Sequence, residues 1–410
     1  MKEGSLKDAC IKKNNVKKTN RMTNAFLIAG ILMIAVNLRP ALASVGPLIE
    51  PIRLSTGLSS SQLGLLTTLP LIAFGVVSTL TPLLTRRFGI GGTLLGAMAL
   101  LAIGTALRSI AWLPALYFGT VLLGIAIAFG NVLLPSLTKR NFSSHSGWVT
   151  SLYSSVMGLG AALAAGLSVP LADGLGWGWR GSIGVWALLA VLAFFFWLPQ
   201  VRRLARSEPS RSYVQAIKEM GGSGLAWQVA LFMGLQSLTF YVVLAWLPSI
   251  LTSRGYDPAY SGWMLSLSQA TGILGSLLIP TIAGARRDQR GIVWMLVIAE
   301  VFGLAGLLLD PPGYTAVWVS LVGFVLGGSF GLSLLFIVVR STNAETATEL
   351  SGMSQSIGYL VAATGPIVFG GLFDWTGSWI LSIALLFVVA ALKLVMGLGA
   401  GADRYVDASR

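Results

Sequence analysis

Two stretches of the chain lie 200 residues apart and share one pattern: SQLGLLTTLPLIAFGVVSTLTPLLTRR at residues 61–87 and SGWMLSLSQATGILGSLLIPTIAGARR at residues 261–287. Each stretch is an apolar run followed by a pair of arginines. A helix rises about 1.5 Å per residue, so about 20 apolar residues cross the hydrocarbon layer of a membrane. Both stretches are therefore predicted to be transmembrane helices at equivalent places in an internal repeat.

Other residues recur at nearly the same offset. The further pairs are Arg140 and Arg340, Gly158 and Gly358, Asp173 and Asp374, and Pro47 and Pro248. Such a set of matched residue types indicates two related halves, because chance spacing of helices does not explain it. The offset spans six helices, so both halves are predicted to insert in the same orientation.

The apolar runs predict twelve transmembrane helices. They cover about residues 23–46, 61–82, 90–109, 113–135, 148–172, 182–199, 226–251, 260–282, 291–309, 314–339, 350–372 and 377–399. We therefore expect an all-α membrane protein with two pseudo-symmetric six-helix halves. Its predicted parts are a basic tail at 1–22, helix bundles at 23–199 and 226–399, a polar linker at 200–225 and a second tail at 400–410.

Composition limits the class of protein. Of the 410 residues, 55% are hydrophobic and 10% are charged, whereas soluble domains hold about 25% charged residues. The net charge of +13 does not indicate nucleic-acid binding, because Lys and Arg lie between the apolar runs and in the first 22 residues. The single cysteine, Cys10, excludes internal disulfides and cysteine metal sites.

The placement of Lys and Arg predicts the orientation in the membrane. With the N-terminus inside, cytoplasmic segments hold 23 of these residues, Arg340 and Lys393 among them, and Arg39 lies within a span. The outer segments hold four: Arg53, Arg108, Arg180 and Arg254. Because cytoplasmic loops are enriched in Lys and Arg, both termini are predicted to be cytoplasmic in a multi-pass protein of the bacterial inner membrane.

Six segments carry a resemblance to a known family. They are NLRP at 37–40, GLLTTLP at 64–70, GNVLLP at 130–135, YVVLAWLP at 241–248, DQRG at 288–291 and LSGMSQS at 350–356. Together they resemble the major facilitator superfamily and, within it, the bacterial cyanate and 2-nitroimidazole transporter family. The resemblance implies the major facilitator fold and secondary-active or facilitative transport of cyanate or nitroimidazole-like compounds by alternating access.

One loop departs from the superfamily pattern. The usual acidic-then-basic loop after the second helix is Thr85-Arg86-Arg87-Phe88-Gly89 here and has no acidic residue, whereas the equivalent loop of the second half keeps Asp288. A conformational latch that needs this acidic–basic pair is therefore not expected in the first half. The arginines are equally consistent with a role in setting topology alone.

Arg39 is the outstanding candidate for a binding site. An ionised residue inside a span costs about 2.5–3.5 kcal/mol on insertion scales, so it needs a partner or a water-filled cavity. One interpretation is structural, with Glu50 or Asp173 as the partner near the outer face. The other is functional, because a guanidinium donates a bidentate fork to carboxylate, nitro or cyanate-like groups. The resemblance favours the functional interpretation, since the first helix of each half lines the cavity in that fold.

The other site candidates are uncharged polar residues within predicted spans. They are Asn131, Gln236, Tyr241, Gln269, Gln355 and Tyr359. Such residues often only bridge helices, but together they fit an apolar cavity with a few placed polar groups. Gln355 and Tyr359 are four residues apart and share a helix face. Phe240 and Trp246 add either an aromatic wall or packing.

Several chemistries have no support in the sequence. Catalytic sets, metal-ligand clusters and phosphate-binding loops are absent, so no enzyme activity, metal or cofactor is expected. Glu300 is predicted to make a helix contact away from the cavity, and His145 to be solvated. No carboxylate lies deep in the first, fourth, seventh or tenth span, so proton coupling lacks an obvious carrier and stays open.

The sequence thus favours a transporter for a small polar or anionic solute. The expected partners are this solute and the lipid bilayer, with or without protons, and we expect a monomer that does not bind nucleic acid. Two alternatives remain open, namely a membrane-embedded sensor or receptor without transport, and a drug efflux pump of the same fold. Flux of a bound solute distinguishes the first alternative from transport.

Overall fold

The structure is a computed structural model that describes residues 25–58, 60–204, 213–309 and 313–406. The predicted tail at 1–22 lies outside the described residues, as do residues 205–212 of the predicted linker and residues 407–410 of the second tail. The part of the chain that the structure describes is helical throughout, apart from its turns and one isolated β-bridge. This confirms the predicted fold class.

The first half begins with a helix at residues 25–37. It continues with α2 (Pro40–Ala43), η1 (Gly46–Leu48), α3 (Ile49–Thr56), α4 (Ser60–Val77), η2 (Ser78–Leu80), α5 (Thr81–Leu107), α6 (Leu113–Phe142), η3 (Ser143–His145), α7 (Ser146–Val169), η4 (Pro170–Gly174), α8 (Gly178–Gly184) and α9 (Trp186–Arg203). The predicted linker contains α10 (Tyr213–Gly222). The second half contains α11 (Gly224–Ser253), α12 (Pro258–Gly284), α13 (Arg290–Leu309), α14 (Thr315–Val339), α15 (Ala344–Thr376) and α16 (Trp379–Ala400).

Ten apolar helical segments of the described chain are long enough to cross a membrane. Two of them, Thr68–Leu107 with 40 residues and Leu113–Gly174 with 62, are about 60 and 93 Å long at 1.5 Å per residue, which is enough for two spans each. Each is interrupted near its middle, the first at Gly89 with φ +71° and the second at η3. The segments therefore correspond to the twelve predicted spans.

Aromatic side chains mark the two faces of the membrane. Exposed Trp and Tyr gather near one end of the bundle, at Trp112, Trp177, Tyr260, Trp263, Tyr314 and Trp375, and near the other, at Trp148, Trp227, Trp294 and Tyr405. Amphipathic rings favour the headgroup level of a bilayer. The second end also carries Arg86, Arg87, Lys139, Arg140, Arg286, Arg287 and Arg290, and we call it the basic end.

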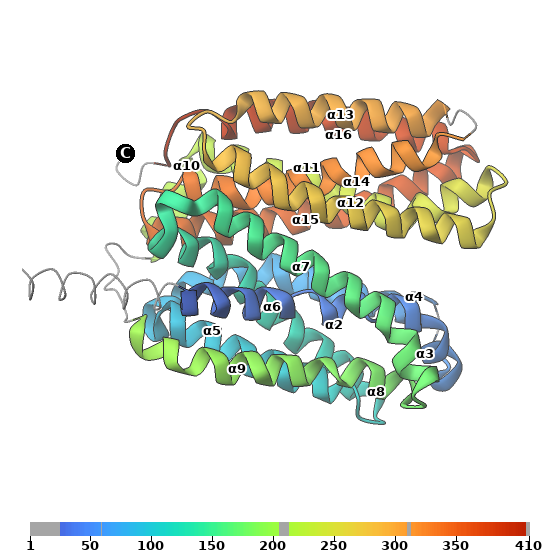
Figure 1. Cartoon of the computed structure of the whole chain (residues 1–410), viewed down its shortest axis with the longest axis horizontal. Helices are drawn as coiled ribbons and strands as arrows, with labels where there is room; N and C mark the ends of the chain where they lie inside the picture. Colours follow the sequence, from blue (N-terminus) through green and yellow to red (C-terminus); the bar gives the residue numbers. More distant parts are fainter. Residues whose placement is uncertain (1–24, 59, 205–212, 310–312, 407–410) are drawn as a thin grey trace, which may run out of the picture.

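The two halves lie side by side as two helical bundles (Figure 1). They meet through α7 against α12 and through α4 and α6 against α15. Some contacts need glycine, because a Cβ at Gly147 of α7 would overlap the backbone of Pro280 and Gly284 in α12. Backbones approach this closely only where side chains are small.

Lys393 is a correction to the predicted topology. It was counted among the cytoplasmic residues, but it lies inside α16, is fully buried and forms an ion pair with Glu300 of α13, which is also fully buried. Glu300 thus makes the expected contact with another helix, and its partner there is a charged residue. Both side chains are fully shielded from solvent, so each charge is stabilised by the other.

Arg340 and Arg108 are also buried, although both were predicted to lie in loops. Arg340 donates to the carbonyls of Ala400 at 2.8 Å and Gly401 at 3.2 Å, and it thereby binds the chain after α16 to the end of α14. Arg108 follows α5 and donates to the carbonyl of Ala41 at 2.6 Å. A charge count along the sequence cannot reveal this burial, because both residues lie at helix ends.

We expect the Glu300–Lys393 pair to behave as a unit. Lys393→Met alone leaves the buried Glu300 without its partner, and Glu300→Gln alone leaves the buried Lys393 without its partner. Each single variant should therefore destabilise the protein by about 3–5 kcal/mol. The double variant Glu300→Leu/Lys393→Met should recover parental stability or exceed it. Apparent melting temperatures of purified protein in detergent measure this, and single variants as stable as the double variant would contradict it.

Candidate functional site

Arg39 lies at a break in the first transmembrane segment. The helix at 25–37 ends in a turn, and α2 restarts at Pro40, which has no N–H to donate to the carbonyl of Val36. Gly160 of α7 packs against this carbonyl, because a Cβ there would lie 2.6 Å from it. The Asn-Leu-Arg-Pro sequence thus produces a local break that holds Arg39 near mid-depth.

The Arg39 guanidinium points toward the second half of the protein. Its central carbon lies 5.0 Å from the ring centre of Phe330 in α14 and 5.8 Å from that of Phe240 in α11. These are cation–π distances. Among the described side chains no carboxylate pairs with Arg39, and Asp173 is exposed in η4. The predicted partnership with Asp173 is therefore wrong, and the Glu50 side chain lies outside the described residues.

Three of the predicted polar residues are brought together around Arg39. The Asn131 amide of α6 donates to the Tyr359 hydroxyl of α15 across 3.4 Å. Tyr241 follows Phe240 on α11, and the centres of their rings lie 5.3 Å apart. Phe74 of α4 completes the group, with its ring centre 4.8 Å from that of Tyr359. We call Arg39, Asn131, Tyr241, Tyr359 and the rings of Phe74, Phe240 and Phe330 the central cluster.

Two predicted glutamines lie one turn from the central cluster. Gln355 precedes Tyr359 by four residues on α15 and is buried. Gln236 precedes Phe240 by four residues on α11, and its amide donates to Ser237 at 2.6 Å and to the Met233 carbonyl at 3.1 Å. The side-chain oxygens of both glutamines are buried without a hydrogen-bond partner among the described residues. Each therefore keeps an acceptor for a water or a ligand.

Gln269 makes no hydrogen bond to the central cluster among the described residues. It lies on α12 and is half-buried. Residues four apart share a helix face, so Gln269 lies on the face of Ile273, which packs toward Gly158 of the other half. Trp246 is likewise outside the cluster, because its indole N–H donates to Pro366 at 3.0 Å within the second half. Its role is packing.

Contacts between the halves close the basic end. Arg86 lies 3.6 Å from both Glu345 and Glu349 of α15. Ser136 of α6 donates to the Ala344 carbonyl at 2.7 Å and accepts from Thr348 at 2.6 Å. No latch from an acidic–basic loop pair was expected in the first half. Arg86 pairs instead with two glutamates of the second half.

The hydroxyls of α7 extend this closure. Ser155 lies 3.2 Å from Ser276 of α12, and Ser154 donates to the Ser276 carbonyl at 3.2 Å. These hydrogen bonds and ion pairs between the halves lie between the central cluster and the basic end. The central cluster is therefore shut off from the basic end in this conformation.

The central cluster suits recognition of a small anion or dipole. Arg39 is half-buried and makes no hydrogen bond within the described chain, so its N–H groups remain available. The rings of Phe240 and Phe330 provide apolar walls, and the Tyr hydroxyls add neutral donors. Sequence analysis missed Phe74 and Phe330, because nothing in the sequence distinguishes a Phe that lines a binding site from a Phe that packs in the core of an apolar helix bundle.

Comparison with known proteins places these features in a family. The family model described as Major Facilitator Superfamily matches residues 25–366. The chain is 44% identical to an uncharacterised transporter, YycB, of Bacillus subtilis (94% of this chain, 96% of that one) and 41% identical to a 2-nitroimidazole transporter of Escherichia coli (93% and 96%). It is 28% identical to the Escherichia coli cyanate transport protein CynX (86% and 91%).

A solved structure shows the same fold. The Escherichia coli fucose:proton symporter FucP superposes with a TM-score of 0.70 over 90% of this chain and 98% of that one, at 10% identity. At this identity the likeness concerns the arrangement of helices alone.

We expect a larger side chain at Gly147 to open the basic end. Gly147→Val forces α7 from α12, and an overlap of this kind costs about 1–3 kcal/mol, so the population of the open form should rise about 5- to 150-fold. The measurement is the labelling rate of Ser136→Cys by a membrane-impermeant maleimide in inverted vesicles, in a Cys10→Ser background. Gly166→Val is the control on the same helix, because nothing lies within 4 Å of a Cβ there. Equal labelling rates in both variants would contradict the closure.

Proposed function

The chain belongs to the Major Facilitator Superfamily of membrane transporters, and we propose that it carries a small polar or anionic solute through the central cluster by alternating access. The observation that supports the site is the position of Arg39. It is a cation at mid-depth between the halves, with aromatic rings against it and no carboxylate partner among the described residues. A bound solute would supply the missing acceptor.

The chemistry of the central cluster supports planar, electron-rich solutes. A guanidinium donates two parallel N–H groups to a nitro or carboxylate group, while Phe240 and Phe330 offer apolar surface to a ring. Relatives named for 2-nitroimidazole and cyanate transport favour this class of solute. The proposed substrate is therefore a cyanate-like anion or a nitroimidazole-like heterocycle.

The closed basic end gives the proposed cycle its starting point. Solute enters from the opposite end, binds at Arg39 and is released after α7 parts from α12 at the basic end. The hydroxyl–hydroxyl contacts and the half-buried pair of Arg86 with Glu345 can break and reform, whereas the buried Glu349 has to be hydrated or paired again when the basic end opens. In this order the cycle gives import, and in the reverse order it gives export.

Replacement of Arg39 tests the site. Arg39→Gln removes charge-assisted hydrogen bonds worth about 1.5–3 kcal/mol, so the affinity for 2-nitroimidazole or cyanate should fall about 10- to 100-fold. Arg39→Lys keeps the charge without the planar fork and should restore only part of it. Binding is measured by thermal shift and flux in proteoliposomes.

The control is Arg53→Gln, which removes an exposed arginine outside the central cluster. If Arg39→Gln binds and transports both solutes like Arg53→Gln, Arg39 is not the site. If the parent binds solute selectively but shows no flux, the sensor alternative holds. If flux is confined to bulky apolar drugs, the efflux alternative holds.

Cys10 reports the proposed orientation. It is the single cysteine and precedes the first span, and we propose that the basic end and both termini face the cytoplasm of a bacterial inner membrane. An impermeant maleimide should then modify the protein in inverted vesicles and leave it unmodified in right-side-out spheroplasts. The reverse pattern would overturn the orientation.

A further inference from the structure

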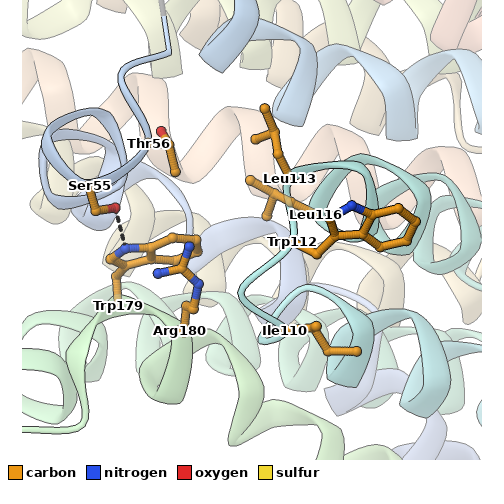
Figure 2. A pocket seen from close by; sticks show the side chains of 8 residues that line it. All are labelled: Ser55, Thr56, Ile110, Trp112, Leu113, Leu116, Trp179 and Arg180. Atoms are coloured by element: carbon orange, nitrogen blue, oxygen red, sulfur yellow. Dashed lines mark hydrogen bonds between the residues drawn. The ribbon is translucent and has the colours of Figure 1, made fainter.

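A cavity lies in the first half, at the end opposite the basic end. It has a volume of about 150 Å³, and an engineered cavity of this size holds one benzene molecule. Figure 2 shows its lining, which comes from the end of α3, the turn between α5 and α6, and α8. Ile110 and Trp112 of the lining are exposed, so the cavity opens to the surface.

The polar side of the cavity is an arginine stacked on an indole (Figure 2). The Arg180 guanidinium carbon lies 4.2 Å from the ring centre of Trp179. The Trp179 N–H donates to the Ser55 hydroxyl at 2.6 Å, which fixes the indole. Within the described residues Arg180 has no carboxylate partner, and its Nε is buried without a hydrogen-bond acceptor. The cavity thus contains a positioned cation that lacks an anion.

The equivalent place in the second half is filled. Trp379 lies 200 residues after Trp179, and the ring centre of Phe373 stacks 4.0 Å from its own at an angle of 18°. Trp246 packs against the same indole, with ring centres 5.5 Å apart. At the 201-residue offset of Pro47 and Pro248, the first-half counterparts of Phe373 and Trp246 are the smaller Ala172 and Val45.

The comparison of the halves shows what is special in the first. Val45, Ala172, Trp179 and Ile183 form a core cluster of the same kind as the one around Trp379 and Ile383. Where the second half stacks a phenyl ring on the indole, the first half stacks a guanidinium and leaves space beside it. A packing role alone needs neither the charge nor the space.

We propose that this cavity binds a small planar carboxylate at the outer surface, separately from the central cluster. The N–H groups of a guanidinium lie in its own plane. The Arg180 guanidinium held over the indole therefore offers a bidentate fork to a carboxylate that lies in the same plane. Leu113 and Leu116 offer apolar surface to the body of the ligand. The fit is to a one-ring acid such as benzoate.

The test measures benzoate binding to purified full-length protein by isothermal titration calorimetry, in an Arg39→Gln background that weakens the central cluster. Arg180→Gln should raise the Kd at least about tenfold, because charge-assisted hydrogen bonds are lost. Arg180→Phe should have the same effect while keeping a ring-on-indole stack like that of Phe373 on Trp379. The Arg180→Phe variant thereby separates the effect of losing the cation from the effect of losing the fold. Melting temperatures show whether each variant is folded.

Arg53→Gln is the matched control, since it removes an exposed positive charge from the same end of the protein. It should change the Kd by less than about twofold. The proposal is overturned if Arg180→Gln and Arg180→Phe bind benzoate as the background does, or if Arg53→Gln weakens binding equally. Inorganic phosphate that displaces benzoate with higher affinity overturns the carboxylate class and assigns the cavity to phosphate or a lipid headgroup, which nanodiscs with and without phosphatidylglycerol distinguish.

Discussion

A charge within the hydrocarbon layer has no water to solvate it, so each buried cation of this chain needs its partner inside the protein. Lys393 has a full ion pair with Glu300. Arg340 has backbone carbonyls at the end of α16 and lies 3.8 Å from Asp403. Arg108, buried at the end of α5, donates to the carbonyl of Ala41. Arg39 has only the faces of two aromatic rings. It differs from the other three because it lies between the two halves and makes no hydrogen bond within the described chain, and this difference makes it the candidate site.

The same constraint shapes the seam between the halves. A seam that must open and close cannot depend on fully buried charges, because exposing and reburying them costs several kcal/mol per ion. The seam is built instead from Gly147 and Gly284 in backbone contact and from serine hydroxyls of α7 and α12. Its ion pairs lie at the basic end, where Arg86 and Glu345 are half-buried and Glu349 is the buried member of the group. The buried pair Glu300–Lys393 stays within one half, where nothing has to separate.

The sequence predicts those features that depend on local composition. Apolar length sets the spans, and the cost of an isolated charge singles out Arg39 and, with it, the neighbouring Asn131 and Tyr359. Features that depend on which sides of two helices pack against each other are not predictable in this way. Lys393 was misplaced because α13 had first to be known to lie against α16, and Gln269 was grouped with residues to which no hydrogen bond joins it in the described chain. The first-half cavity was not predicted from the sequence, because it depends on which small side chains lie opposite Trp179 and leave space there.

The repeat explains why the central cluster is asymmetric. At the 201-residue offset of Pro47 and Pro248, Arg39 corresponds to Phe240, and these two residues face each other with 5.8 Å from the guanidinium carbon to the ring centre. Equivalent positions that meet must lie beside the pseudo-two-fold axis, so the axis passes through the central cluster. Two arginines there would repel each other in a medium of low dielectric constant, and two phenylalanines would offer no polar contact. One cation opposite one ring avoids both outcomes, and it places a single binding site where motion of either half reaches it equally.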